Sequence, residues 1–432
     1  MTEKLLGLLL VLALVSLGLM SGVMLDFVFF YPLFMSFIWM IGGVYFYFHW
    51  ERRGGNPREL PHMTATPFVS IIIPCYNEGE NVADTIAAAC ATNYPDFEVV
   101  AVNDGSRDNT GAILDRLTAD FPRLRVVHLA ENQGKAMALR MGTLAAKSEY
   151  IVCIDGDALL DKNAVAYLVK PLVDNPRVGA VTGNPRIRTR STMLGKVQVG
   201  EFSSIIGLIK RAQRIYGNIF TISGVIVGFR RAALHNTGYW SLNMITEDID
   251  VSWMQQMKHW QIQYEPCALC WILMPETFRG LWKQRLRWAQ GGAEVYFKNI
   301  QKIWQWSNHR MWVLILDYCL CAAWSYSFLL SILLWSIGKF MPMPEGLNVP
   351  AIYPPEFWGI LLATVCIFQF SLALLIESRY EPDLLKSIGW TIWYPLVFWI
   401  IAVLTTLVGF PKAFFKHRDK RGVWVTTDRG LK

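Results

Sequence analysis

Polar side chains that could carry chemistry follow three successive stretches that are rich in valine and isoleucine. These segments are residues 75–78, 103–106 and 155–157, which together supply tyrosine, asparagine and carboxylate groups. Aspartates one residue apart, as at Asp155 and Asp157, are suitable ligands for Mg²⁺ when a substrate phosphate completes its coordination. Asparagine, aspartate and glycine also form ordinary turns, so none of the three segments establishes a site by itself.

Two more polar segments lie further along the chain. Residues 246–248 place Glu247 and Asp248 directly after Thr246. This order is typical of a helix start, because a threonine hydroxyl can cap the first turn and carboxylates favour its positive end. The alternative is that one carboxylate acts as a general base. Residues 283–288 hold three cations and a tryptophan, a pattern that a basic amphipathic helix on a bilayer surface would also show.

The pair Gly134 and Lys135 resembles the end of the phosphate-binding loop found in nucleotide triphosphatases. That loop needs another glycine five positions earlier, and the residue there is Leu129. The sequence therefore excludes a nucleotide triphosphatase of that kind.

The elements that must position these residues alternate along the chain. Short, nearly continuous apolar runs predict buried parallel strands, and the segments between them predict helices. We expect strands over 68–74, 98–103, 125–130 and 150–155, and helices over 81–91, 110–120 and 135–147. This order predicts an open, mostly parallel α/β sheet, in which ligands bind beyond the carboxyl ends of the strands. The first three polar segments all lie at that edge.

The composition is that of a membrane protein. Of 432 residues, 53% are hydrophobic and 17% are charged, whereas a soluble domain has about 25% charged residues. This balance excludes a disordered chain and is a poor fit to an ordinary soluble enzyme. A helix needs about 20 residues to cross a bilayer. Apolar stretches near that length lie at 5–25, 27–48, 311–338, 357–376 and 388–410.

The net charge of +7 and its distribution predict an orientation. Arg52, Arg53 and Arg58 follow the second apolar stretch, so the positive-inside rule puts the region between the two groups of spans in the cytoplasm. The basic tail 411–432 should lie on the same side, yet three C-terminal spans would put it outside. We therefore expect one of those segments to be re-entrant or to lie in the interface.

Five motifs in order resemble the processive family 2 glycosyltransferases, which include cellulose, chitin, hyaluronan and poly-N-acetylglucosamine synthases. The motifs are residues 74–78, 103–106, 155–157, 246–248 and 284–288, and membrane spans follow them. The stretches 178–195 and 268–294 are similar to the bacterial members that make β-1,6-linked poly-N-acetylglucosamine, well beyond the shared motifs. The resemblance covers nearly the whole chain.

The resemblance implies a nucleotide site at the first strand ends. Tyr76 and Glu78 match residues that hold the uridine, with Tyr76 near the uracil ring. Asp104 matches the carboxylate that reads the uracil base, and Lys135 stands where a cation can face the nucleotide.

The resemblance also implies the metal and acceptor sides of the site. Asp155 and Asp157 match the metal motif, with Asp157 as the direct ligand. Asp248 matches the general base, and Glu247 is its neighbour at the acceptor. The motif that holds the diphosphate and the acceptor end is matched by Gln284, Arg287 and Trp288.

The enzyme implied by the resemblance is an inverting, processive transferase with an A-type glycosyltransferase domain between transmembrane helices. It would polymerise N-acetylglucosamine from UDP-GlcNAc into a β-1,6-linked chain, with Mg²⁺ or Mn²⁺ as cofactor. The polymer would be exported across the bacterial inner membrane for a biofilm matrix. The alternative is another processive synthase of the hyaluronan or chitin type. A transporter or receptor without chemistry has no use for acids at three strand ends, and nucleic acid is not an expected partner.

The expected organisation follows from these motifs and spans. We expect a transmembrane hairpin over 1–51, a cytoplasmic catalytic domain over 52–277, interfacial helices over 278–310, further spans over 311–410 and a basic tail over 411–432. Asp317 should face the interior of the helix bundle, because a carboxylate that faces lipid is costly.

The resemblance further implies a small two-span membrane subunit and regulation by cyclic di-GMP. A set of basic residues could bind such an anion, or could form a solvated or lipid-facing surface. The set consists of Arg186, Arg188, Arg190, Lys210, Arg211 and Arg214.

Overall fold

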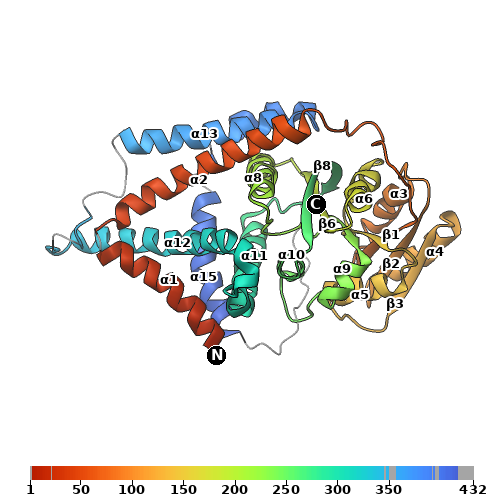
Figure 1. The fold of residues 1–432 in the computed structure, drawn as a ribbon, viewed down its shortest axis with the longest axis horizontal. Coiled ribbons are helices and arrows are strands. Elements are labelled where there is room, and N and C mark those ends of the chain that lie inside the picture. The colour runs from red at the N-terminus through yellow and green to blue at the C-terminus, as the bar shows by residue number, and fades with distance from the viewer. Residues whose placement is uncertain are drawn as a thin grey trace.

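The structure is a computed structural model, which describes residues 2–20, 22–344, 347–349, 357–391, 393–394 and 398–416. Long helices lie at one end of the molecule and a helix-covered sheet lies at the other (Figure 1). Most of the predicted basic tail, residues 417–432, lies outside the described residues.

The sheet has eight strands in the order β3-β2-β1-β4-β7-β6-β8-β5. Its first half is parallel and consists of β1 (Val69–Cys75), β2 (Phe97–Asp104), β3 (Leu124–Leu129) and β4 (Tyr150–Ile154). Each boundary lies within one residue of the prediction. Ile72 of β1 pairs with Val100 on one side and Cys153 on the other, so the carboxyl ends of these strands meet at one edge. The predicted open α/β sheet is confirmed.

The second half of the sheet is mixed, and the sequence pattern did not predict its strands. Strand β7 runs antiparallel to β4 and β6, β6 runs parallel to β8, and β5 runs antiparallel to β8. Their bounds are Leu159–Leu160 for β5, Val178–Ile187 for β6, Ile226–Arg230 for β7 and Gln261–Ile272 for β8.

Helices cover both faces of the sheet. Successive residues of a strand point to opposite faces; Ile71 packs with α3, α4 and α6, whereas Ile72 packs with α5, α9 and α10. The bounds are α3 Val82–Cys90, α4 Thr110–Asp120, α5 Lys135–Ala145, α6 Ala164–Asp174, α9 Arg231–Thr237 and α10 Glu247–Met257. The three helices predicted between the parallel strands are therefore confirmed as α3, α4 and α5.

Four helices among the described residues are long and apolar enough to cross a membrane, which identifies a membrane protein. They are α1 (Thr2–Met20), α2 (Met24–Phe46, continued by the π-helical turn Tyr47–Glu51), α12 (Trp312–Gly338) and α13 (Phe357–Glu377). The predicted stretch 388–410 is described only in part, because residues 392 and 395–397 lie outside the described residues. Its described part contains the short helix α14 (Ile388–Thr391) and the start of α15 (Ile400–Phe415), which has 16 residues, so the span expected there stays a prediction.

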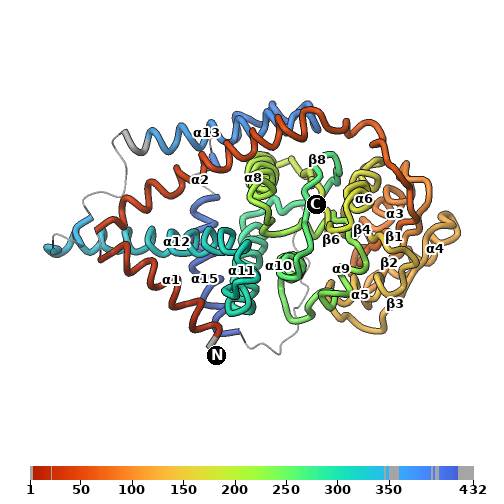
Figure 2. Tube along the Cα trace, viewed as in Figure 1, coloured from red at the N-terminus to blue at the C-terminus, as the bar shows by residue number. Residues whose placement is uncertain are grey.

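Helix α11 (Phe278–Ile303) lies between the sheet domain and the apolar helices, as the trace in Figure 2 shows. None of its residues 284–300 is exposed, so the alternative of a helix lying on the bilayer surface does not fit this stretch. Helix α15 approaches it closely, because a Cβ atom at Gly409 would lie 2.8 Å from the backbone nitrogen of Gln290. A short 3₁₀ helix, Trp306–Met311, joins α11 to α12.

A continuous helical stretch also joins the sheet domain to the membrane helices. It consists of α7 (Met193–Glu201), the π-helical segment Phe202–Leu208 and α8 (Ile209–Tyr216). Helix α8 packs against α2, and the π-helical segment packs against α13. The 3₁₀ helix Pro382–Ser387 follows α13.

Buried ion pairs tie these elements together. Arg211 of α8 donates to both carboxylate oxygens of Glu51 at the end of α2, at 2.7 and 2.8 Å, and also pairs with Glu377 at the end of α13. Arg186 of β6 lies 2.8 Å from Glu377 and 3.0 Å from Glu381. Strand β6 and helix α8 are therefore bonded to two membrane helices through side chains that are almost fully buried.

This cluster corrects one expectation about the basic set. Arg186, Arg190 and Arg211 form ion pairs with carboxylates of this same chain. Arg186 and Arg211 are also buried, so these two do not form a solvated or lipid-facing surface. Because these cations already have anionic partners, they are not suited to bind another anion.

The variant Arg211→Leu should lower the free energy of unfolding by about 3–5 kcal/mol, because it leaves the buried Glu51 without its cation and Glu377 with Arg186 alone. Thermal unfolding of the purified protein in detergent measures the change. The exposed pair of Lys386 with Asp383 supplies the control, and Lys386→Leu should leave the midpoint unchanged. Equal midpoints for Arg211→Leu and the wild type would show that the cluster does not hold the membrane helices on the domain.

Candidate active site

A cavity of about 720 Å³ opens at the edge of the sheet predicted to bind ligands. Nine of the eleven predicted site residues line it, while Tyr76 and Asp104 do not. The nine are Glu78, Lys135, Asp155, Asp157, Glu247, Asp248, Gln284, Arg287 and Trp288. Segments more than 200 residues apart in sequence thus meet at one site, as expected from the carboxyl ends of parallel strands.

Asp104 supports the loop that enters helix α5. It is fully buried at the end of β2, and its two carboxylate oxygens accept hydrogen bonds from the backbone nitrogens of Gln133 and Gly134, each at 2.8 Å. Burial raises the pKa of Asp104, although these two hydrogen bonds oppose the shift. Gly105 must follow it, because its φ is +63° and a Cβ atom there would lie 2.5 Å from the carbonyl carbon of Glu131.

Lys135 lies at the centre of the acidic side chains. Its Nζ is 2.6 Å from Asp155, which follows β4, and 3.3 Å from Glu247 at the start of α10. Burial by itself would lower the pKa of Lys135, but the two carboxylates raise it above its ordinary value. The lysine therefore stays charged and holds the end of β4 next to helix α10.

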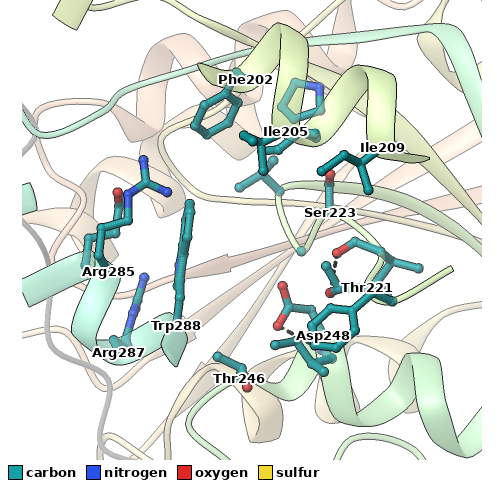
Figure 3. A pocket seen from close by; sticks show the side chains of 18 of the residues that line it. Phe202, Ile205, Ile209, Thr221, Ser223, Thr246, Asp248, Arg285, Arg287 and Trp288 are labelled. Atoms are coloured by element: carbon teal, nitrogen blue, oxygen red, sulfur yellow. Dashed lines mark hydrogen bonds between the residues drawn. The ribbon is translucent and has the colours of Figure 1, made fainter. Parts of the chain in front are cut away.

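Asp248 faces the open part of the cavity. Figure 3 shows its carboxylate on the opposite side of the cavity from Trp288. Burial, supported by the neighbouring charge of Glu247, raises the pKa of Asp248 to about 6. A carboxylate with a pKa close to neutral is a more effective general base than one with an ordinary pKa. Gly224 lies against it, since a Cβ atom there would be 3.2 Å from Asp248 Oδ2.

The helix-start interpretation of residues 246–248 is partly confirmed. Helix α10 begins at Glu247 and carries three acids in its first turn, but the side chain of Thr246 forms no capping hydrogen bond. Instead Thr246 packs against helix α11, where a Cβ atom at Gly291 would lie 2.3 Å from its Cγ2 atom. The segment can therefore be both a helix start and the source of a general base, because the same helix start brings Asp248 into the cavity.

Helix α11 contributes side chains to the cavity that carry polar atoms without a hydrogen-bond partner. Gln284 Oε1 and Arg287 Nε are buried and have no hydrogen-bond partner among the described residues, and both side chains line the cavity. Buried polar atoms of this kind are costly unless a ligand or water satisfies them. Trp288 adds a flat aromatic surface to the same wall.

Lys210 lines the cavity, although the sequence analysis placed it only in a set of basic residues and not among the site residues. Its Nζ donates to Ser223 Oγ at 2.6 Å and to Thr182 Oγ1 at 3.1 Å. Burial lowers the pKa of Lys210 to about 7, while Asp248 opposes this shift. Three cations within residues 210–214 resemble a surface helix, so no local sequence signal could distinguish this buried lysine.

The cavity continues between the membrane helices. Tyr31 and Trp39 of α2, and Asp317 and Trp324 of α12, belong to its lining. Tyr31 donates a hydrogen bond of 3.2 Å to Asp317 Oδ1. The prediction that Asp317 faces the interior of the bundle is confirmed.

The comparisons with known proteins agree with this fold. The model of glycosyl transferase family 2 matches residues 70–238. The chain is 38% identical over 406 residues to the poly-β-1,6-N-acetyl-D-glucosamine synthase of Staphylococcus aureus strain COL, and 38% identical over 412 residues to that of Staphylococcus epidermidis strain RP62A. Each match covers 94% of this chain and 98% of the relative.

The chain therefore belongs to glycosyl transferase family 2. Its curated relatives of similar length are poly-β-1,6-N-acetyl-D-glucosamine synthases. A solved mannosyltransferase of Pyrobaculum calidifontis, in complex with GDP-mannose and Mn²⁺, shares the fold with a TM-score of 0.62 at 19% identity, over 94% of this chain and 98% of that one.

The contact between Gly291 and Thr246 leads to a test with two adjacent glycines. Gly291→Ala should lower the rate of sugar transfer at least about tenfold, because the new methyl group would push α11 away from the helix start that carries Asp248. Gly292→Ala is the control, since a Cβ atom there would make only ordinary contacts, with Tyr318 at 3.5 Å and Phe220 at 3.9 Å. Equal rates for the two variants would contradict the close packing described here.

Proposed function

We propose that this protein is a processive, inverting glycosyltransferase that polymerises N-acetylglucosamine from UDP-GlcNAc into a β-1,6-linked chain. The observation that carries the proposal is the cavity itself, in which Asp248 and Trp288 face each other and whose lining continues to Asp317 between membrane helices. The family membership and the 38% identity to poly-β-1,6-N-acetyl-D-glucosamine synthases support this substrate and product.

The reaction needs one base and one displacement. Asp248 accepts the proton of the acceptor hydroxyl as its oxygen attacks the anomeric carbon of the donor sugar. The new carbon–oxygen bond forms on the face opposite UDP, the bond to the diphosphate breaks, and the configuration inverts. A retaining mechanism would need a second carboxylate as nucleophile, whereas this single displacement does not. Glu247 lies next to the base, on the acceptor side.

The departing diphosphate needs positive charge. Arg287 lines the cavity with its Nε unpartnered, so it can donate to a phosphate oxygen. A divalent cation fits the donor set of Asp155 and Asp157, two carboxylates at the end of β4, with the diphosphate as the remaining ligand. Mg²⁺ or Mn²⁺ held there would neutralise charge on the leaving group.

The nucleotide would lie at the first two strand ends. Glu78 is buried and lines the cavity, and Tyr76 directly precedes Asn77, whose φ is +54°. We assign Tyr76 and Glu78 to the uridine. Asp104 acts on the uracil side indirectly, because its hydrogen bonds hold the 133–134 loop in place. We assign Gln284 and Trp288 to the acceptor end.

The membrane helices give the product a path. The four candidate spans among the described residues are an even number, so they would return the chain after α13 to the side on which it began. We place the catalytic domain and the residues after α15 in the cytoplasm, with the polymer leaving through the inner membrane of a bacterium. A reporter enzyme fused after Phe415 should give a cytoplasmic signal, and a periplasmic signal would contradict this topology.

The partners proposed beyond the substrate rest on the family resemblance. They are a small two-span membrane subunit and regulation by cyclic di-GMP. Because Arg186, Arg190 and Arg211 are engaged by Glu51, Glu377 and Glu381, we do not assign the cyclic dinucleotide to them.

Product analysis separates this proposal from its nearest alternative. Membranes that contain the protein, supplied with UDP-GlcNAc and Mg²⁺, should form a polymer of β-1,6-linked N-acetylglucosamine. Incorporation of glucuronic acid would indicate a hyaluronan-type synthase, and a β-1,4 linkage would indicate a chitin-type synthase.

Two substitutions test the assigned roles. Asp248→Asn removes the base and Arg287→Ala removes the cation at the diphosphate, so each should abolish polymer formation, with a loss of at least about 100-fold. UDP release from UDP-GlcNAc measures the rate. Asp84→Asn, an exposed change on α3, is the control and should retain the wild-type rate. Normal synthesis by Asp248→Asn or Arg287→Ala would overturn the assignment.

The raised pKa of Asp248 predicts how the rate depends on pH. A carboxylate with a pKa of about 6 becomes protonated at a higher pH than an ordinary aspartate, and the protonated form cannot act as a base. The value of kcat/KM should therefore be constant above about pH 7 and fall as the pH is lowered through about 6. A rate that stays constant down to about pH 5 would be inconsistent with Asp248 as the base.

A further inference from the structure

Arg285 lies in the middle of the 284–288 motif, yet the mechanism above does not use it. Its guanidinium carbon is 4.2 Å from the centroid of the Trp288 ring, within the range of a cation–π contact. Its Nη2 donates to Glu201 Oε2 at 2.6 Å. The side chains of Arg285 and Glu201 are only 10% and 9% exposed, so this ion pair is well shielded from water.

The cation covers one face of the indole and leaves the other to the cavity. Figure 3 shows Arg285 on the side of the Trp288 ring away from Asp248. The guanidinium carbon also lies 5.9 Å from the centroid of the buried Phe398 ring. Arg285 therefore contacts two aromatic rings, and Glu201 at the end of α7 fixes its position.

We propose that Arg285 and Glu201 are positioning residues that set the plane of Trp288 as a platform for the acceptor sugar. This inference rests on the proposed function, since it assigns the open face of Trp288 to the terminal N-acetylglucosamine of the acceptor. The C–H face of a pyranose stacks on an aromatic ring only when the two planes are parallel, so the tilt of the indole determines how well the acceptor is held in front of Asp248.

The residue types fit this role. A guanidinium is planar and stacks on an aromatic face while its edge still donates to a carboxylate. A lysine could pair with Glu201, but it would not form the flat backing of the ring. A buried cation also needs a counter-charge, which explains why Glu201 lies at the end of α7, facing the motif.

The test measures the KM of the acceptor and the KM of the donor separately, with the full-length protein in detergent. The probes are a β-1,6-linked N-acetylglucosamine trisaccharide as acceptor and UDP-GlcNAc as donor. Arg285→Met and Glu201→Gln should each raise the KM of the trisaccharide about tenfold, a factor that corresponds to about 1.4 kcal/mol, with kcat and the KM of UDP-GlcNAc unchanged. Arg285→Lys should give an intermediate increase.

Glu294→Gln is the matched control on the same helix. Glu294 forms a shielded ion pair with Lys416 at 2.8 Å and has no contact with Trp288 among those of the described residues. Loss of the ion pair between Glu294 and Lys416 should leave the KM of the trisaccharide unchanged. An acceptor KM that stays at the wild-type value in both Arg285→Met and Glu201→Gln would overturn the inference, and so would an equal increase in both KM values.

A double variant decides the case in which single variants do not fold. Loss of UDP-GlcNAc binding in Arg285→Met and Glu201→Gln would show that the single variants do not fold. The protein with both changes contains no unpaired charge at this position and is then measured instead. A raised acceptor KM in that protein supports the inference, and a wild-type value overturns it. A wild-type enzyme that transfers no sugar to the trisaccharide would instead overturn the proposed function.

Discussion

The structure depends on one buried group of charges at the junction between the membrane helices and the sheet domain. Arg211 joins Glu51 at the end of α2 to Glu377 at the end of α13, and Arg186 bonds strand β6 to the same Glu377. Charges removed from water are stable only with close partners, so these arginines fix where each helix meets the domain. The apolar helices alone would not be fixed in this way, because lipid is as favourable for an apolar side chain as another helix is.

The active-site cavity crosses this junction, and its geometry follows from it. The walls on the domain side come from strand ends and helix α10, and those on the membrane side come from α2, α12 and α13. A shift of α2 or α13 would separate Tyr31 and Asp317 from the space in front of Trp288. The fixed junction thus connects a base, an aromatic platform and a membrane path in one space, which is what a polymerising enzyme that exports its product needs.

Local patterns in the sequence were sufficient for the parallel half of the sheet and for the residues at its edge. Apolar runs identify β1 to β4 within one residue. The polar segments after β1 and β4 reach the cavity as expected, through Glu78, Asp155 and Asp157, whereas the segment after β2 does not line it. The rest depends on contacts between distant residues. Arg211 finds its partners 160 and 166 positions away, and Lys210 lies in a run of cations that resembles a surface. The span predicted over 388–410 stays a prediction, because residues 392 and 395–397 lie outside the described residues.

The central claim is that one continuous cavity holds the growing polymer from Asp248 to the membrane helices. An experimental structure of the enzyme stopped during synthesis, with UDP and Mg²⁺ bound, tests it most directly. The account predicts that the terminal sugar stacks on Trp288 with its hydroxyl toward Asp248, and that the preceding sugars pass between Tyr31, Asp317 and Trp324. A polymer that leaves the site toward the cytoplasm, away from these helices, would contradict it.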